Sequence, residues 1–149
     1  MGFAWRYNLS GGPPNVQSFL FATTRTLTKG DIVTLTSGEI ALGATGNSTF
    51  PGVFVGAEDA DDESKTSPGV VEGTNSVTRA IVITNTDAVY GVADNNARLS
   101  GDPLDIAGAT GAMTIASVTN TDFLVIVSKK ADSDLTMVQI APGEHAFAE

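Results

Sequence analysis

The chain has 149 residues, enough for one domain whose core needs no covalent staples. It contains one histidine and no cysteine, whereas glycine and threonine occur 16 and 18 times, which excludes disulfides and cysteine-based sites and leaves few of the groups that enzymes use. The net charge of −9 argues against direct binding of nucleic acid or of an anionic membrane.

Residues 1–16 are predicted to form an extended N-terminal arm. Its aromatic residues alternate, so in an extended chain all three side chains point the same way. A flexible Gly-Gly pair and an extended Pro-Pro pair follow them. Because aromatic side chains are strong interface anchors, we expect the arm to contact a partner or a sister subunit. The expected interface residues are Phe3, Trp5, Arg6, Tyr7 and Leu9. The alternative is a first strand that packs on the protein's own core.

Residues 17–149 are predicted to form an all-β domain with a compact barrel or sandwich-like fold. Short runs rich in Thr, Val and Ile are interrupted at close intervals by Gly, Asn, Asp or Pro, which is typical of short strands and tight turns. The expected strands are Gln17–Thr24, Ile32–Thr36, Glu39–Leu42, Gly52–Ala57, Val77–Thr84, Ala88–Val92, Ala112–Val118, Asp122–Ser128 and Thr136–Ile140.

Two connections and one strand allow finer predictions. Asn85–Asp87 and Thr119-Asn120 are predicted to form hairpin turns. In the strand at Asp122–Ser128, apolar residues occupy both faces, which predicts a strand covered on both sides. A short helix is expected at Asp59–Lys65 or Asn95–Ser100.

The sequence contains a faint internal echo. Lys29-Gly30-Asp31-Ile32-Val33 is followed by Gly43-Ala44-Thr45-Gly46, and Ser100-Gly101-Asp102-Pro103-Leu104 is followed by Gly108-Ala109-Thr110-Gly111. The spacings differ, and such segments are also common turn material. Both a repeat and coincidence remain open.

Two polar features are candidate sites. The acidic cluster at Glu58–Glu63 lacks the glycine and glutamate spacing of a helix-loop-helix calcium loop, so we expect a solvated loop and leave a looser divalent site open. His145 has no cysteine or second histidine with which to form a usual zinc site, and we expect it to serve packing or an interface. We expect no catalytic residue, metal or cofactor.

The second half resembles a known family. The segments Val89–Ile106, Phe123–Ser128 and Met137–His145 are similar to tailed-phage head decoration (capsid cement) proteins, and the resemblance covers residues 81–145. It implies a small β-barrel-like domain, a homo-oligomer with a trimer favoured, that binds outside an icosahedral shell and bridges major capsid subunits. The expected partner is therefore the major capsid protein, and the expected location is the outer surface of the virion.

Synthesis in the host cytoplasm is expected, because Met1–Arg6 lacks the charged region and apolar core of a signal peptide. The alternative function is a non-enzymatic binding module of a virion appendage or cell surface, such as a tail, fibre or carbohydrate-binding β-domain.

Overall fold

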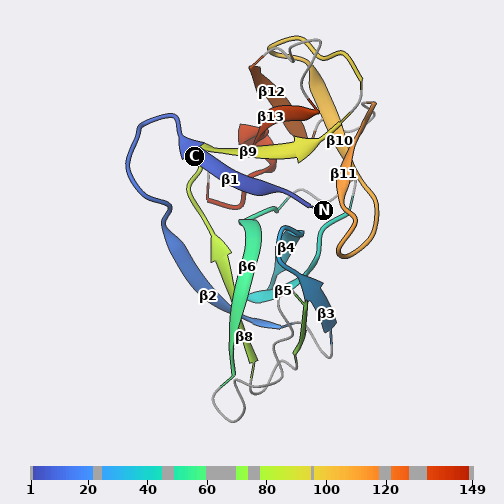
Figure 1. Cartoon of the computed structure of the whole chain (residues 1–149). Helices are drawn as coiled ribbons and strands as arrows, with labels where there is room; N and C mark the ends of the chain where they lie inside the picture. Colours follow the sequence, from blue (N-terminus) through green and yellow to red (C-terminus); the bar gives the residue numbers. More distant parts are fainter. Residues whose placement is uncertain are drawn as a thin grey trace.

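A computed structural model of the chain describes residues 2–21, 25–44, 49–59, 70–73, 78–94, 96–117, 122–127 and 134–147. These residues are mostly β-strands, with one 3-10 turn, η2, at Pro142–Glu144. The predicted all-β class with a barrel is confirmed. Figure 1 shows a barrel built by the first half of the chain and, above it, a sheet built mainly by the second half.

The barrel is closed, with the strand order β2-β5-β4-β6-β8. Its neighbouring strands are antiparallel, apart from the parallel pair of β2 and β5 that completes the ring. Alternation along the strands points one apolar row inward, and a separate apolar cluster that includes Phe21, Val33, Phe54 and Val82 fills the interior. The strands are β2 (Val16–Phe21), β4 (Ile32–Thr36), β5 (Glu39–Leu42), β6 (Gly52–Asp59) and β8 (Thr78–Ile83). A two-stranded ribbon of β3 (Arg25–Thr28) and β7 (Val70–Gly73) accompanies them.

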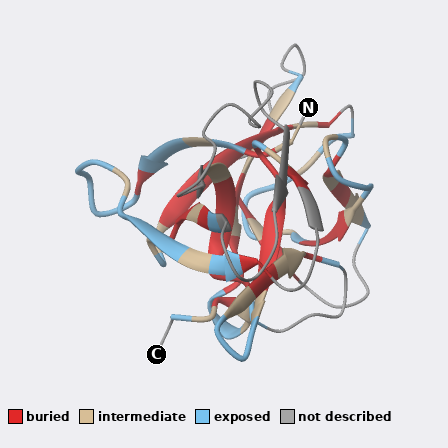
Figure 2. Cartoon of the chain, turned by 90° about the horizontal axis from the view of Figure 1, so that it is seen from below, coloured by how far each residue is buried: buried red, intermediate tan, exposed pale blue. Residues whose placement is uncertain are grey.

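The second sheet has six antiparallel strands in the order β1-β9-β13-β12-β10-β11. One face packs against the outside of the barrel, and residues from both layers form one large apolar cluster. Figure 2 shows that buried residues run through the strands at the centre of the molecule. The strands are β1 (Ala4–Asn8), β9 (Ala88–Ala93), β10 (Pro103–Ala107), β11 (Thr114–Ser117), β12 (Phe123–Val127) and β13 (Leu135–Ile140).

The predicted free arm at residues 1–16 is wrong over residues 3–8. Ala4–Asn8 forms β1, which pairs with β9 at the edge of the six-stranded sheet. Phe3 is 2% exposed, and its ring stacks on Phe123 with the ring centroids 5.0 Å apart. The alternative expectation, a first strand on the protein's own core, is the observed one. The burial of a Phe side chain contributes about 1.5–3 kcal/mol, which explains why this segment docks.

All nine expected strands are present with small shifts in their ends. Sequence reasoning missed β3, β7 and β10, which are short, begin with proline or carry charged residues, and it gave β1 only as the alternative to a free arm. The expected helix at Asn95–Ser100 is wrong over residues 96–100, which form an irregular connection. Asn85–Asp87 does form a turn, but it links the barrel to the sheet and is not a hairpin. The turn at Thr119-Asn120, and the helix and acidic loop beyond Asp59, lie outside the described residues.

The internal echo has a counterpart in the fold. Around the closed barrel from β2, the neighbouring strands follow the order β2-β8-β6-β4-β5. Without β1, the larger sheet has the order β9-β13-β12-β10-β11. Strands at the same place in the two orders also come in the same order along the chain, so each strand of the first half has a counterpart in the second. The pair Ile32↔Val53 between β4 and β6 matches the pair Pro103↔Leu124 between β10 and β12. Both β6 and β12 contain a register shift one residue later, between Phe54 and Gly56 and between Val125 and Val127.

The turn before each matching strand is also the same. Gly30 and Gly101 both adopt positive φ angles, of 98° and 90°. The carboxylates of Asp31 and Asp102 each accept the backbone N–H three residues earlier at 2.8 Å. Each turn exchanges two backbone hydrogen bonds with its facing strand, through Phe54 in one half and Val125 in the other. We therefore describe residues 16–83 as the first unit and residues 88–140 as the second unit of an internal structural repeat.

Phe3→Ala is expected to lower the free energy of unfolding by about 3–5 kcal/mol, because it removes a buried ring from the cluster shared by the two units. Urea denaturation measures the change. Leu9→Ala, at an exposed position a few residues later, is the matched control and should cost under about 1 kcal/mol. A small loss for Phe3→Ala would contradict the docked position of the segment.

The two repeated turns should differ in strength. Asp31 also accepts hydrogen bonds from the Thr110 hydroxyl and from the Gly111 N–H, which ties the first unit to the second. Asp31→Ala is therefore expected to cost about 3 kcal/mol or more, and Asp102→Ala about 1 kcal/mol. Denaturation of the two variants side by side measures the difference. Equal losses would show that the contact between the units contributes little.

Candidate functional site

A bulge in β1 decides where the expected interface residues lie. Trp5 is opposite Tyr90 and Tyr7 is opposite Val89, so Arg6 is an extra residue in β1. The three aromatic side chains therefore do not share one face as the alternation predicted. Trp5 packs against the core cluster, whereas Tyr7 is 39% exposed.

The remaining expected residues lie at or near the surface around this bulge. The Arg6 side chain passes close over Gly91, where a Cβ on the glycine would be 2.7 Å from Arg6 Nε. Leu9, just after the strand, is 53% exposed. Trp5 is half-buried, and its indole N–H donates to Asn8 Oδ1 at 3.0 Å. Of the five expected interface residues, only Phe3 is fully buried in the core.

An apolar groove of about 540 Å³ lies beside β1. Trp5, Val55 and Ile83 line it together with Lys29, which supplies a positive charge. Among the described residues, the far edge of β1 has no strand partner. An edge strand beside an apolar groove can bind an extended segment of another protein. The full lining is Gly2, Phe3, Ala4, Trp5, Lys29, Gly30, Val55 and Ile83.

The face of the six-stranded sheet that points away from the barrel carries apolar side chains. Leu124 and Ile126 on β12 and Met137 on β13 are partly buried, whereas Phe123 and Val125 belong to the core. Within the described residues, β12 is therefore fully covered on one side and partly covered on the other, where cover on both sides was expected. Sequence reasoning found the apolar alternation of this strand, but it did not assign the outward residues to a surface.

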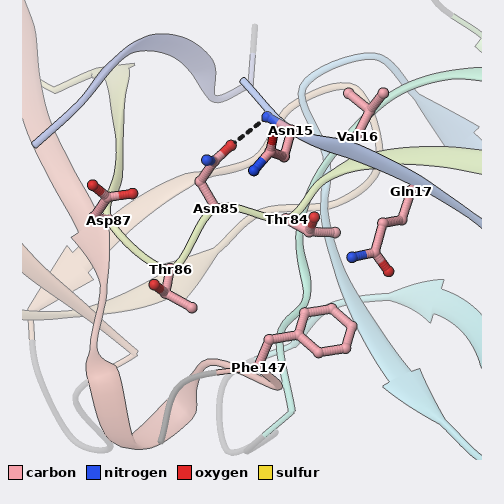
Figure 3. Close-up of a pocket in the computed structure, with 8 residues that line it drawn as sticks. All are labelled: Asn15, Val16, Gln17, Thr84, Asn85, Thr86, Asp87 and Phe147. Carbon is pink, nitrogen blue, oxygen red and sulfur yellow. Dashed lines mark hydrogen bonds between the residues drawn. The ribbon is translucent and has the colours of Figure 1, made fainter. Parts of the chain in front are cut away.

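A polar hollow of about 500 Å³ lies at the junction of β2 and the turn at Asn85–Asp87 (Figure 3). Asn85 Oδ1 accepts the Asn15 N–H at 2.6 Å. Phe147 is 40% exposed at the rim, and its ring stacks on Phe19 with the centroids 6.2 Å apart. Hydrogen bonds from Ser10 lower the pKa of Asp87 below its ordinary value. Polar groups beside an aromatic ring suit a small polar ligand. The lining is Asn15, Val16, Gln17, Thr84, Asn85, Thr86, Asp87 and Phe147.

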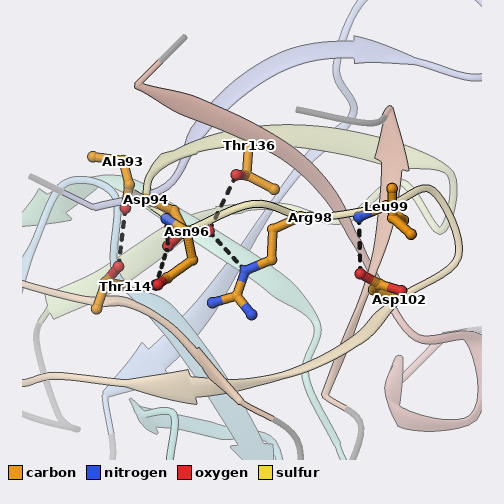
Figure 4. A network of polar contacts seen from close by, with 8 residues as sticks. All are labelled: Ala93, Asp94, Asn96, Arg98, Leu99, Asp102, Thr114 and Thr136. Atoms are coloured by element: carbon orange, nitrogen blue, oxygen red, sulfur yellow. Dashed lines mark hydrogen bonds and ion pairs between the residues drawn. The ribbon is translucent and has the colours of Figure 1, made fainter. Parts of the chain in front are cut away.

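The polar network at Asp94 is structural in character (Figure 4). Asp94 accepts from Arg98 Nε at 2.8 Å, from the Asn96 side chain at 3.0 Å and from the Thr136 hydroxyl at 3.3 Å. Burial opposes ionisation of this carboxyl, but the hydrogen bonds from Arg98 and Asn96 outweigh it and lower the pKa of Asp94. In the comparison of the two units, Asp94 directly after β9 corresponds to the buried Phe21 at the end of β2. The second unit thus has an ion pair where the first has a ring.

His145 is buried and held by the backbone around it. Its Nδ1 accepts the Phe147 N–H at 3.1 Å, which requires this nitrogen to be unprotonated. The residue also forms a bridge with Phe50. Burial lowers the pKa of His145 below 6.5. The expected packing role fits this position.

Searches of protein-family models, curated proteins and solved structures found no match to this chain. Across the described parts of the chain, His, Asp and Glu do not gather in a group of three that could hold a metal ion. The described residues also form no helix long and apolar enough to cross a membrane. The acidic cluster beyond Asp59 lies outside the described residues.

His145 should make the folded state sensitive to mild acid. Its folded pKa is lowered, so the unfolded chain takes up the proton first, and stability falls as the pH drops below about 6.5. Thermal denaturation at about pH 7.5 and about pH 5.5 is expected to show a larger loss of stability for the wild type than for His145→Gln. The same loss in both proteins would assign the acid sensitivity to other groups.

Proposed function

We propose that this chain is a structural virion protein that binds the outside of an icosahedral phage capsid and stabilises it by bridging major capsid subunits. The observation that carries the proposal is the edge strand β1, on which Trp5 lines an apolar groove and Arg6, Tyr7 and the following Leu9 are exposed. The resemblance of residues 81–145 to head decoration proteins supports the same function. The family resemblance also favours a homo-oligomer, with a trimer as the expected state.

The composition of this surface supports protein binding. Tyr, Trp and Arg are the residues that most often provide the binding energy of protein interfaces, while Lys, Asp and Glu are depleted there. The chain as a whole has a net charge of −9, which keeps such a protein soluble and away from nucleic acid. A capsid presents many identical sites, so an oligomer gains avidity even if each contact is weak.

A second candidate function is a binding module for a small polar ligand such as a carbohydrate. The observation that favours it is the polar hollow, with amide groups from Asn15, Gln17 and Asn85 and the exposed ring of Phe147. This hollow shares no lining residue with the apolar groove beside β1. A variant at Phe147 tests the hollow without changing a residue of the groove.

The triple variant Arg6→Ala/Tyr7→Ala/Leu9→Ala is expected to bind capsids at least about 30-fold more weakly than the wild type. This decrease in affinity corresponds to the loss of one interface hot spot of about 2 kcal/mol. The capsids used are expanded capsids that were assembled without this protein. Co-sedimentation with increasing protein concentration measures the affinity. Point variants are preferable to removal of residues 1–16, because truncation would also remove Phe3 from the core.

Leu99→Ala, at a position that is 69% exposed on another part of the molecule, is the matched control and should bind like the wild type. Unchanged binding of the triple variant would refute the β1 surface as the capsid contact. Wild-type protein that binds no capsid but binds a glycan, with the binding lost in Phe147→Ala, would favour the second candidate function.

A further inference from the structure

The barrel uses only part of one edge of β2. β5 pairs with β2 at Leu20 and Phe21, so the first half of β2 extends past the start of β5. In Figure 1, β2 runs along the outer side of the molecule, with β8 on its inner side. Among the described residues, no strand pairs with the outer edge of β2 before Leu20. Residues 15–18 are all exposed.

The backbone groups at this outer edge can bind an added strand. The Asn15 C=O accepts the Thr84 N–H at 2.9 Å, so the backbone groups of Asn15 face β8. Because backbone groups alternate between the two edges along a strand, those of Gln17 also face β8. The N–H and C=O groups of Val16 and Ser18 therefore face outward, where no described strand pairs with them.

The internal repeat identifies the equivalent edge in the second unit. Val82 and Val138 have the same place in the two units, because each is paired with the residue directly before the register shift of β6 or β12. On their other side, Val82 is paired with Gln17, and Val138 with Tyr90. Gln17 and Tyr90 are therefore equivalent. The equivalent stretches are residues 15–18 of the first unit and residues 88–91 of the second.

In the second unit this edge is occupied by β1. All of residues 88–91 are paired with residues of β1 and are buried. Directly beyond β1, the Thr114 hydroxyl of β11 donates to the Ala93 C=O at 3.0 Å. This is the place at which β5 reaches β2 in the first unit, at Leu20. The exposed residues 15–18 thus have the position that a strand covers in the second unit.

Exposed apolar side chains gather at this edge of β2. Among the described residues, six large apolar side chains are notably exposed, and three of them lie here: Val16, Leu20 and Phe147, at 54%, 36% and 40%. The Phe147 ring reaches the edge because it stacks on Phe19. An added strand would cover these side chains as well as the free backbone groups, which favours a segment with apolar or aromatic side chains.

Carboxylates flank the same edge. Glu39 is paired with Leu20 at one end, and Asp87 lines the hollow beside Val16 at the other end. Arg79, which is also paired with Leu20, lies on the inner side, in β8. The whole chain has a net charge of −9. A segment that binds this edge is therefore expected to carry basic rather than acidic side chains.

We propose that the free edge of β2 at residues 15–18 binds an extended segment of a partner protein as an added antiparallel strand. The segment has apolar and aromatic side chains with a basic residue among them, as β1 has in Ala4–Tyr7. Backbone hydrogen bonds give such a contact its affinity, and the side chains give it specificity. The inference goes beyond the proposed function, because it concerns a second surface and does not require the partner to be a capsid protein.

Amide hydrogen exchange, followed by NMR, tests the state of the edge in the protein alone. The N–H groups of Val16 and Ser18 are expected to exchange at least about tenfold faster than those of Gln17 and Phe19, which are bonded to β8. Equal protection of all four N–H groups would overturn the inference, because the edge would then already be paired.

The binding probe is a synthetic peptide with the sequence of residues 2–8, Gly-Phe-Ala-Trp-Arg-Tyr-Asn, because β1 is the strand that occupies the equivalent edge. NMR titration of the whole protein is expected to give a Kd of about 1 mM or tighter, with slower amide exchange at Val16 and Ser18. The same peptide with Arg6→Glu should bind at least about threefold more weakly. No binding at about 2 mM peptide, or changes confined to β9, would overturn the inference.

Ser18→Pro removes an outward N–H and is expected to weaken peptide binding at least about tenfold, because proline cannot donate to an added strand. Ser18→Thr keeps the N–H and is the matched control, with a Kd within about twofold of the wild type. Thermal denaturation checks that both variants fold. If Ser18→Pro does not fold, Val16→Pro, at the same edge, replaces it. Unchanged binding by a folded proline variant would overturn the inference.

Discussion

The apolar layer between the barrel and the six-stranded sheet is the contact on which the rest of the structure depends. The barrel and the six-stranded sheet both turn apolar side chains toward each other. Each therefore buries the apolar side chains of the other. Phe3 enters the same layer and stacks on Phe123. Its burial fixes β1 against β9, and this in turn places Arg6, Tyr7 and Leu9 at the surface. The candidate binding surface is therefore a consequence of how the core is closed.

The internal repeat explains why the two units have the same order of neighbouring strands. The matching turns at Asp31 and Asp102 come directly before the equivalent strands β4 and β10, which have equivalent neighbours in their sheets. The units diverge where they meet other parts of the chain. In the first unit β5 pairs with β2 and closes the barrel, whereas in the second unit β1 takes a place beside β9. The additional bonds from Thr110 and Gly111 to Asp31 hold the two units together.

Sequence patterns predicted the strands well, because alternation of apolar side chains and the residues of tight turns are local properties. The same patterns misplaced the N-terminal segment. An alternating aromatic row followed by Gly-Gly and Pro-Pro is compatible with a free arm and with an edge strand, and the choice depends on whether an apolar surface is available elsewhere. The bulge at Arg6, which moves Tyr7 away from the face of Trp5, has no signal in residues 3–9 themselves. The polar hollow also brings Asn15, Asn85 and Phe147 together from distant parts of the chain.

The sequence by itself determined the all-β class, the scarcity of catalytic side chains and the acidic character of the chain, because these follow from composition and from short-range periodicity. It also contained both copies of the Gly-Asp turn, although their shared sequence is too short to establish a repeat. The tertiary structure alone decided that the two turns begin equivalent units, that Phe3 is a core residue, and that Tyr7 lies on the opposite face of the sheet from Trp5. Those outcomes depend on which apolar faces meet across long separations in the chain, and local sequence does not specify such pairings.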